Sequence, residues 1–336
     1  MKYTQKDFKS DQEVRWCAGC GDYAVLAALQ RVLPKVCEEK GIDKEKVVVI
    51  SGIGCSSRLP YYMNTYGFHT IHGRATAVST GVKVANPELC VWQASGDGDA
   101  LAIGGNHFIH AIRRNVDINI MLFNNRIYGM TKGQYSPTSK LGAVTKTSPY
   151  GTVENPFNPG SLVLGSKGTF FARSLDVDLA LSEEIMLEGS RHKGTSVMEF
   201  LTNCVIFNNG VHSDVTDKET RAERTIVLRD GQKMLFGKDN EKCLVLDGWK
   251  LKVARVDEVD ESEILVHDSH SDNLGLQMQL ADMRWPEFPV ALGVIRRVSD
   301  GTYDERVATQ AEEVTQKAKI RSLDELLSSG ATWKVE

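Results

Sequence analysis

The sequence has no long hydrophobic run and no large excess of charge of either sign. No apolar stretch approaches the roughly 18 residues of a membrane-spanning helix, and the polar start MKYTQKDFKSDQE lacks the apolar segment of a signal peptide. The 40 basic and 44 acidic side chains give a formal net charge of -4, which argues against a whole-surface affinity for nucleic acid or anionic membranes. We therefore expect a cytoplasmic protein that binds neither nucleic acid nor a membrane.

The chain also lacks the dense, even set of cysteines that is typical of a small secreted scaffold. Its seven cysteines are spread over 336 residues, at positions 17, 20, 37, 55, 90, 204 and 243. In a reducing cytosol, several cysteines that lie close together indicate metal or redox chemistry. Cys17 and Cys20, in the segment WCAGCGDY, are near neighbours in sequence. Taken alone, their spacing fits a redox pair, half of a zinc site or two ligands of a cluster.

Short apolar runs that alternate with helical patterns predict the fold class. Four runs rich in Val, Ile or Phe predict β-strands at 47–57, 90–99, 118–125 and 196–204. Between and around them, helical patterns cover 23–36, 75–85, 106–113 and 175–188. Because the strands are apolar on both faces, we expect an α/β fold with a mostly parallel sheet covered by helices.

The composition changes along the chain and suggests three parts. We expect a first domain at 1–204, a smaller C-terminal region at 205–300 and an exposed helical tail at 301–336. Within the first domain, residues 129–168 are rich in Gly, Pro, Ser and Thr and weakly periodic. Such a long loop is typically functional or disordered, and we place it near the binding edge of the sheet.

Residues with metal-binding chemistry follow the predicted strands. Cys55, Asp97, Asn125 and Cys204 each come after one of the four apolar runs. In open parallel sheets, ligands bind beyond the carboxyl ends of the strands. We therefore expect these four side chains to share one site, rather than to lie on unrelated solvated loops.

Two of these strand ends carry a diphosphate-binding pattern. The segment GDGD (96–99) follows one strand, and Asn125, 28 positions after Asp97, ends the next. Glycines let backbone N–H groups approach a phosphate, while carboxylate and amide oxygens suit a hard cation. The pattern resembles the thiamine diphosphate motif, and the resemblance implies that Asp97, the Asn125 side chain and the Ile127 carbonyl hold Mg2+.

A dinucleotide site is the competing interpretation of the glycines after the first strand. The segment GIG (52–54) begins like GxGxxG, but Ser57 occupies the position of the last glycine. No acidic residue ends the next strand at the distance that a ribose requires. These departures disfavour a dinucleotide site.

Several segments together resemble the β subunit of 2-oxoacid:ferredoxin oxidoreductases. The resemblance spans roughly residues 12–300 and is carried by WCAGCGDY, GIGCSSRLP, HGRATAVSTGVKVANP, GDGDALAIGGNHFIHAIRRN and NNRIYGMTKGQYSPTS, followed by the late Cys204. It implies thiamine diphosphate and one 4Fe-4S cluster, with the ligands Cys17, Cys20, Cys55 and Cys204. We expect the other three cysteines, Cys37, Cys90 and Cys243, to be small buried hydrophobic residues.

The resemblance also implies further site residues. It places cofactor contacts at Ile53, Gly54, Cys55, Ser56, His72, Gly96, Gly98, Asp99, Asn125, Gly129, Met130 and Thr131. His72 is the expected catalytic residue, bonded to a phosphate or to the reacting centre, although a lone histidine is more often a packed polar residue. Lys132 and Arg58 are expected to bind the distal carboxylate of a dicarboxylic substrate, which favours 2-oxoglutarate. The alternative for Lys132 is a solvated loop lysine.

The family's reaction is the oxidative decarboxylation of a 2-oxoacid, with coenzyme A as acyl acceptor and ferredoxin as electron acceptor, and it is reversible as reductive carboxylation. For a 2-oxoglutarate enzyme the product is succinyl-CoA. The chain has no obvious glutamate partner for the aminopyrimidine ring, and the family carries that domain on another subunit. We therefore expect activity only with an α subunit, in an αβ pair that is itself doubled.

Two other functions stay open at this point. A cluster-free thiamine diphosphate decarboxylase or synthase shares the GDG and NN segments, but it has no use for four clustered cysteines. A zinc-stabilised binding protein uses four thiolates, but it has no use for the diphosphate pattern.

Overall fold

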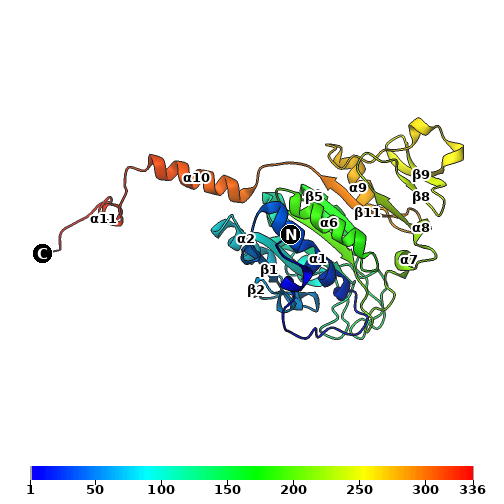
Figure 1. The fold of residues 1–336 in the computed structure, drawn as a ribbon, viewed down its shortest axis with the longest axis horizontal. Helices are drawn as coiled ribbons and strands as arrows, with labels where there is room; N and C mark the ends of the chain where they lie inside the picture. Colours follow the sequence, from blue (N-terminus) through cyan, green and yellow to red (C-terminus); the bar gives the residue numbers. More distant parts are fainter. Residues whose placement is uncertain (1, 336) are drawn as a thin grey trace.

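A computed structural model describes residues 2–335 and shows an eight-stranded sheet at the centre of the molecule (Figure 1). The strand order is β2-β1-β3-β4-β6-β5-β11-β7, and the first six strands in this order are mutually parallel. β11 runs antiparallel to β5 and parallel to β7. This arrangement confirms the expected α/β fold. The strands are β1 (Val47–Ser51), β2 (Tyr66–His69), β3 (Cys90–Gly96), β4 (Asn119–Asn124), β5 (Phe170–Leu175), β6 (Ser196–Leu201), β7 (Thr225–Leu228) and β11 (Val290–Arg297).

The central strands are apolar on both faces because each face is covered. In β1, Val47 and Val49 pack into one apolar layer, while Val48 and Ile50 pack into the other. Successive side chains of a strand point to opposite faces, so a strand between two helical layers reads as a continuous apolar run. This pattern is why β1 was recognisable in the sequence.

Helices cover both faces of the sheet. On one face, α1 (Asp22–Lys40) and α6 (Leu179–Arg191) lie side by side (Figure 1). The second apolar layer contains side chains from helices on the other face, namely α2 (Ala75–Ala85), α4 (Gly105–Arg114), α5 (Pro159–Gly165) and α9 (Leu274–Asp282). The remaining helical turns are α3 (Asp97–Leu101), α7 (Ser213–Thr216), α8 (Arg221–Arg224) and the 3-10 turns Gln5–Phe8, Lys44–Lys46, Ser56–Tyr62, Val256–Glu258 and Glu261–Glu263.

The largest error of the sequence-based assignment lies at 170–178. The helix expected from Leu175 begins at Leu179, because Leu175 is the last residue of β5, a strand that the sequence did not predict. Asp178 caps the helix by accepting a hydrogen bond from the Leu181 N–H at 3.0 Å. β5 contains the buried Arg173, whose charge breaks the apolar run that would have identified a central strand.

The region beyond residue 204 contributes to two sheets. β8 (Leu235–Phe236), β9 (Lys242–Asp247) and β10 (Lys250–Arg255) form a small antiparallel sheet with its own apolar cluster. β7 and β11, however, are part of the main sheet. The proposed division at 204 therefore separates strands that pair within one sheet, and it stays a prediction.

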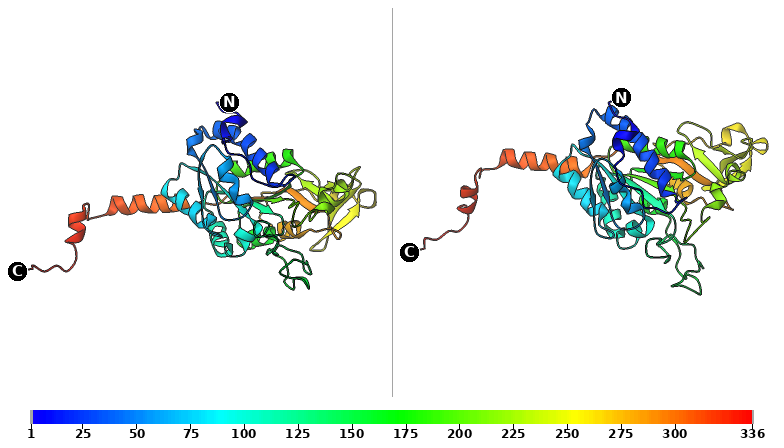
Figure 2. Two further views of the ribbon diagram at one scale, coloured as in Figure 1. Left: turned by 90° about the horizontal axis from the view of Figure 1, so that it is seen from below. Right: turned by 60° about the horizontal axis from the view of Figure 1, so that its bottom comes forward.

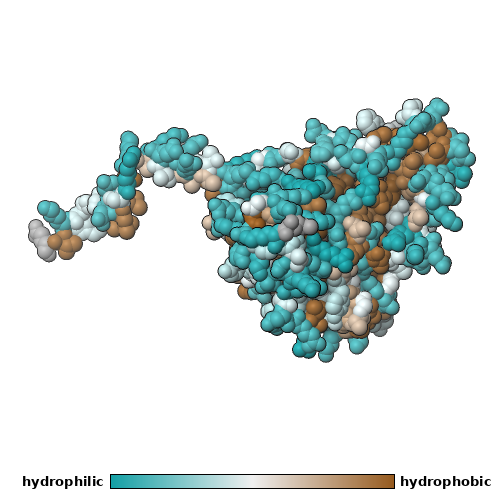
Figure 3. Space-filling model, in the orientation of Figure 1, coloured by the Kyte–Doolittle hydropathy of each residue, from teal (hydrophilic) through white to brown (hydrophobic). Residues whose placement is uncertain are grey.

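The last part of the chain projects from the body (Figures 1 and 2). It contains α10 (Tyr303–Lys317) and α11 (Leu323–Leu327). Its end carries exposed large apolar side chains at Ile320, Leu323, Leu326, Leu327, Trp333 and Val335. Figure 3 shows brown, hydrophobic patches on this projecting segment. Among the helices of residues 2–335, none has the length and apolar character needed to cross a membrane.

Candidate active site

The carboxyl ends of β1, β3 and β4 meet at one edge of the sheet, because these strands are parallel neighbours. The GIG turn (52–54) follows β1, and Asp97 begins α3 directly after β3. Asn125 follows β4. The structure therefore brings together the two halves of the predicted diphosphate motif, which the sequence separates by 28 positions.

Asp97 is a buried carboxylate that two hydroxyl groups hold in place. Ser136 and Thr138 both donate to its Oδ2 atom. Burial raises the pKa of Asp97, while these two hydrogen bonds act in the opposite direction. Both hydroxyls contact the same oxygen, and neither contacts Oδ1.

A tight turn after β4 brings the two other predicted magnesium ligands together. The Asn125 Oδ1 atom accepts a hydrogen bond from the Ile127 N–H at 3.1 Å. Between them, Arg126 has a φ of 56°, in the left-handed region that is uncommon for residues other than glycine. The turn therefore places the Asn125 amide and the Ile127 backbone on one short segment next to Asp97.

Gly98 lets Tyr128 pack directly against the GDG segment. A Cβ atom at Gly98 would lie 2.2 Å from the Tyr128 ring, so no larger residue fits without a shift. The Tyr128 hydroxyl donates to the Gly98 carbonyl at 2.9 Å. Burial, followed by the charges of Asp97 and Asp99, raises the pKa of Tyr128 to about 12, which keeps the phenol protonated as a donor.

Asp99 connects three segments at the same edge. Its Oδ1 atom accepts from the backbone N–H groups of Ile53 (3.0 Å) and Gly73 (2.7 Å), and it lies 2.8 Å from His72 Nδ1. Its Oδ2 atom is buried without a partner among the described residues. A Cβ atom at Gly52 would lie 2.0 Å from that oxygen, so the GIG turn needs its first glycine. Asp99 thus fixes the GIG turn and the orientation of His72.

Two of the predicted cluster cysteines flank Gly129. A Cβ atom at Gly129 would lie 3.3 Å from Cys204 Sγ and 3.8 Å from Cys55 Sγ. The Trp16 indole donates to the Cys55 carbonyl at 2.7 Å and so joins the WCAGC segment to the turn after β1. All seven cysteines are free thiols, and Cys37, Cys90 and Cys243 are buried as expected.

The four thiols lie close enough to influence one another. Burial is the main cause that raises the pKa of Cys55 to about 11, and the neighbouring Cys204 and Cys17 add to it. Burial likewise raises the pKa of Cys20, with smaller contributions from Cys55 and Cys204. Within residues 2–335, however, no three His, Cys, Asp or Glu side chains are gathered in a group that could hold a single metal ion.

The other expected contacts lie around these two centres. Ser56 is buried, and its Oγ atom lies 3.4 Å from the position of a Cβ atom at Gly96. Gly54 has a φ of 141°, which favours glycine. Met130 and Thr131 are exposed, and the Thr131 hydroxyl bonds the side chain of Gln134.

The two predicted substrate residues are not brought into contact. Arg58 is half-buried, and its Nη1 atom donates to the Arg15 carbonyl at 3.1 Å. Its charge acts on Cys55, whose pKa it lowers. Lys132 is exposed and borders a shallow surface depression that Ile206 and Phe207 also line. Arg58 therefore lies beside the thiols, whereas Lys132 lies on an open surface.

Sequence reasoning missed the residues that orient the site. The sequence predicted no separate role for Ser136, Thr138 or Tyr128, which belong to the segment NNRIYGMTKGQYSPTS. The signal that would have found them is the run of hydroxyl residues in SPTS (136–139), in a loop expected to lie near the sheet edge.

The chain is similar to known proteins over most of its length. The family model for the thiamine pyrophosphate enzyme, C-terminal TPP binding domain, matches residues 52–200. The 2-oxoglutarate oxidoreductase subunit KorB of Mycobacterium tuberculosis is 47% identical over 334 residues, which cover 98% of this chain and 88% of that protein. The 2-oxoglutarate synthase subunit KorB of Archaeoglobus fulgidus is 48% identical over 56% of this chain and 69% of its own length.

A solved structure is similar over nearly the whole chain. It is a 2-oxoglutarate:ferredoxin oxidoreductase from Magnetococcus marinus with 2-oxoglutarate, coenzyme A and succinyl-CoA bound. The TM-score is 0.76 at 31% sequence identity, and the match covers 98% of this chain and 97% of that one.

Proposed function

The chain belongs to the β subunits of 2-oxoacid:ferredoxin oxidoreductases, and on this premise we propose that it converts 2-oxoglutarate to succinyl-CoA in a complex with an α subunit. The observation that carries the proposal is the convergence of Asp97, Asn125 and Ile127 at one sheet edge, beside the thiols of Cys55 and Cys204. The family makes the chain an enzyme subunit rather than a zinc-stabilised binding protein. A cluster-free decarboxylase would have no use for the four thiols.

The residues at the sheet edge fit thiamine diphosphate held through Mg2+. Asp97 Oδ1, the Asn125 amide oxygen and the Ile127 carbonyl are the hard oxygen donors that Mg2+ prefers. Gly96 leaves the backbone open for a diphosphate to approach, whereas Tyr128 covers Gly98. When bound, thiamine diphosphate supplies the electron sink on which a 2-oxoacid loses CO2.

His72 is the residue that we propose holds a proton at this site. Its Nδ1 atom is 2.8 Å from Asp99 Oδ1, so the ring proton on Nδ1 is donated to the carboxylate. In a neutral imidazole with that tautomer, Nε2 is an acceptor. The side chain is about one third exposed (36%), so Nε2 is able to accept a proton from the substrate.

We propose that Cys17, Cys20, Cys55 and Cys204 ligate one 4Fe-4S cluster that passes electrons to ferredoxin. Support comes from the four free thiols at the same edge and from their mutual effect on pKa. Zinc has no accessible redox change and would give electrons from the substrate no exit, whereas a 4Fe-4S cluster would accept them one at a time. Such a cluster is consistent with a cytoplasmic location.

Lys132 and Arg58 are proposed to recognise the distal carboxylate of 2-oxoglutarate. Lys132 lies in a depression that is open to solvent, where an ion pair with a substrate would be weak. Exposed apolar side chains surround it, including Val144 and Ile206. An α subunit that covers this surface would exclude water and strengthen the pair. The half-open site is the structural reason to expect no activity from the β chain alone.

The proposal is tested by co-expressing the chain with its α subunit and purifying the complex without oxygen. We expect bound thiamine diphosphate, magnesium, iron and sulfide, and coenzyme A-dependent reduction of ferredoxin with 2-oxoglutarate in preference to pyruvate. The β chain alone should be inactive under the same conditions. A complex that binds thiamine diphosphate but contains zinc and no iron would contradict the proposal.

A further inference from the structure

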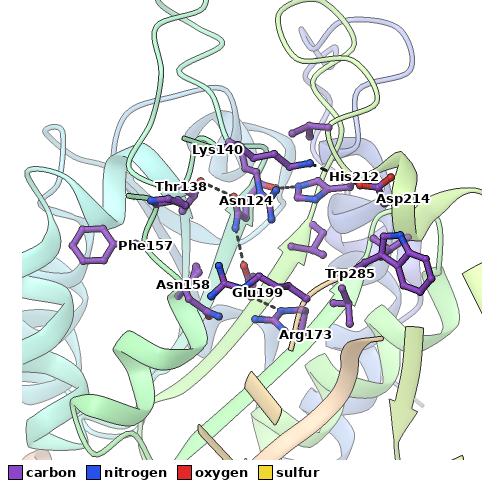
Figure 4. A pocket seen from close by; sticks show the side chains of 18 of the residues that line it. Asn124, Thr138, Lys140, Phe157, Asn158, Arg173, Glu199, His212, Asp214 and Trp285 are labelled. Atoms are coloured by element: carbon purple, nitrogen blue, oxygen red, sulfur yellow. Dashed lines mark hydrogen bonds and ion pairs between the residues drawn. The ribbon is translucent and has the colours of Figure 1, made fainter. Parts of the chain in front are cut away.

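A second cavity lies at the same edge of the sheet but outside the proposed cofactor site. It has a volume of about 550 Å3 and lies beyond the ends of β4 and β6, between the loop at 138–159 and the segments around 211–215 and 283–285 (Figure 4). None of the residues assigned above to thiamine diphosphate, magnesium or the cluster lines it.

The floor of the cavity is a neutral, fully bonded network. Glu199 accepts from Arg173 Nε at 2.6 Å and from the Asn124 amide at 2.7 Å, and all three side chains are buried (Figure 4). Both carboxylate oxygens of Glu199 are thereby occupied by different partners. This acid is therefore not available to pair with another cation in the cavity.

Three further cations line the walls, and two of them have acidic partners. Lys140 lies 3.8 Å from Asp214, and Arg284 donates to Asp282 at 2.7 Å. The third cation is Arg126. Its side chain makes no hydrogen bond or ion pair within residues 2–335, and its Nε atom is completely enclosed without a partner. The lining thus has an excess of positive charge concentrated at one arginine.

Arg126 as a whole is half-buried, but its Nε atom is enclosed without a hydrogen-bond partner among the described residues. An enclosed donor that makes no hydrogen bond is unfavourable, and buried charges in proteins are as a rule paired. The unpaired Nε–H is explained if Arg126 serves a partner that comes from outside the chain.

The remaining walls define the shape and polarity of that partner. Phe157 and Trp285 lie on opposite sides of the cavity (Figure 4) and are 49% and 38% exposed. Aromatic faces suit a flat or apolar body. A guanidinium fork suits the two oxygens of a carboxylate or phosphate. The His212 ring, which bonds the Asn124 carbonyl at 2.8 Å, adds a neutral wall because burial lowers its pKa to about 3.

We propose that this cavity binds a small organic oxyanion whose phosphate or carboxylate group pairs with Arg126 and whose apolar body lies between Phe157 and Trp285. The cavity adjoins the proposed cofactor site, because Thr138 lines it and bonds Asp97, but the inference does not rest on the proposed reaction. Its volume is within the usual range for pockets that enclose small molecules.

The test uses the αβ complex saturated with thiamine diphosphate and Mg2+, so that anions do not bind at the diphosphate site. Phenyl phosphate, benzoate, inorganic phosphate and phenol are titrated by calorimetry. We expect phenyl phosphate or benzoate to bind more tightly than inorganic phosphate, because only they fill both parts of the site, and phenol not to bind. The ratio of phenyl phosphate to benzoate affinity distinguishes a phosphate ligand from a carboxylate ligand.

Variants of the cavity sharpen the test. Arg126→Met should weaken binding of the preferred probe at least tenfold, as expected for the loss of a charge-assisted pair, and Arg126→Lys should give an intermediate affinity. Trp285→Ala should weaken the aromatic probes but leave inorganic phosphate unchanged. Arg31→Met, which removes an exposed arginine paired with Glu183 on the helical face of the molecule, should bind every probe as the unmodified complex does.

The thermal midpoint of each variant serves as the control for folding. Arg126→Met removes a half-buried cation without a partner among the described residues, so we expect its midpoint without probe to be equal to or above that of the unmodified complex. Unchanged affinity of the preferred probe in Arg126→Met would overturn the proposal. It would equally be overturned if no probe bound to the unmodified complex. If Arg126→Met then also weakened the association of the two subunits, the partner of Arg126 would be a group of the α subunit.

Discussion

The Thr138 hydroxyl is hydrogen-bonded to Oδ2 of Asp97, the same oxygen that receives the Ser136 hydroxyl. Two donors on one oxygen fix the carboxylate and leave only Oδ1 for a metal ion. A carboxylate that binds through one oxygen suits Mg2+, whereas Ca2+ commonly takes carboxylates through both oxygens and accepts more ligands. The hydroxyl pair is therefore a candidate determinant of metal choice at the proposed site.

Thr138→Val and Ser136→Ala should lower the affinity for Mg2+ and reduce the preference for Mg2+ over Ca2+. We expect about a tenfold loss of Mg2+ affinity for each, since the partners of metal ligands commonly contribute tenfold to a hundredfold. The measurement is metal-dependent binding of thiamine diphosphate to the αβ complex, titrated with either ion. Thr147→Val, on the exposed loop, is the control. An unchanged ratio of the two metal affinities would show that Asp97 does not need these hydroxyls.

The cluster proposal predicts a selective loss of electron transfer. Replacing Cys17, Cys20, Cys55 or Cys204 by Ser should remove iron and sulfide and abolish ferredoxin reduction, while thiamine diphosphate still binds, because the magnesium ligands are unchanged. Cys37→Ala is the matched control, since Cys37 lies on α1 and is buried in the apolar layer. We expect its iron content to equal that of the unmodified complex. Retained ferredoxin reduction in Cys17→Ser would refute the assignment.

A test of Lys132 has to separate the effect of its charge from the effect of its backbone conformation. Its φ of 76° lies in the left-handed region, so Lys132→Gly relieves local strain as well as removing the ammonium group. Lys132→Met removes the charge alone and keeps the strained position. We expect the kcat/KM ratio of 2-oxoglutarate to pyruvate to fall about tenfold or more in Lys132→Met, as for a lost charge-assisted bond. The ratio should be retained in large part in Lys132→Arg.

The outcome with Lys132→Gly then becomes informative. If only the glycine variant changed the ratio, the backbone of the loop, rather than the ammonium group, would discriminate between substrates. If neither variant changed it, the interpretation of Lys132 as a solvated loop residue would stand.

The sequence predicted those parts of the site that follow regular strands. β1, β3 and β4 are apolar on both faces and were therefore predicted, although the predicted strands end at residues 57, 99 and 125 and the observed ones at Ser51, Gly96 and Asn124. The roles of Asp97 and Asn125 followed from the resemblance to the thiamine diphosphate motif. The hydroxyls of Ser136 and Thr138 were not predicted, because they reach Asp97 from an aperiodic loop about 40 positions away. Contacts of this kind depend on the path of the loop, which no local pattern encodes.

The same reason explains why Arg126 was overlooked. In the sequence, Arg126 lies between the two predicted ligands Asn125 and Ile127. No pattern there indicates that its side chain lines a different cavity. β5 was missed because Arg173 interrupts its apolar run. The charge of Arg173 is tolerated in a central strand only because Glu199, on the neighbouring strand β6, pairs with it at 2.6 Å. That pairing becomes visible only when the order of the strands is known.

His192 gives the fold a predictable sensitivity to acid. It is buried at the end of α6, and its Nε2 atom lies 2.8 Å from the Thr169 hydroxyl. Burial, followed by the charge of Arg297, lowers its pKa to about 4 from the usual 6.5. Between these two values the unfolded chain binds a proton that the folded chain does not. The contribution to stability is therefore present above about pH 6.5 and is lost as the pH falls towards 4.

We expect this residue to account for about 2 kcal/mol of the stability that the chain loses between pH 7.5 and pH 5, since one unit of pKa shift corresponds to about 1.4 kcal/mol. In His192→Gln, the difference between the free energies of unfolding at the two pH values should be smaller by about that amount. The measurement is urea unfolding of the purified chain at each pH. His270→Gln, at an exposed histidine, should keep the original dependence. An identical slope in His192→Gln would mean that His192 is protonated in the folded chain, contrary to its enclosure beside Phe170.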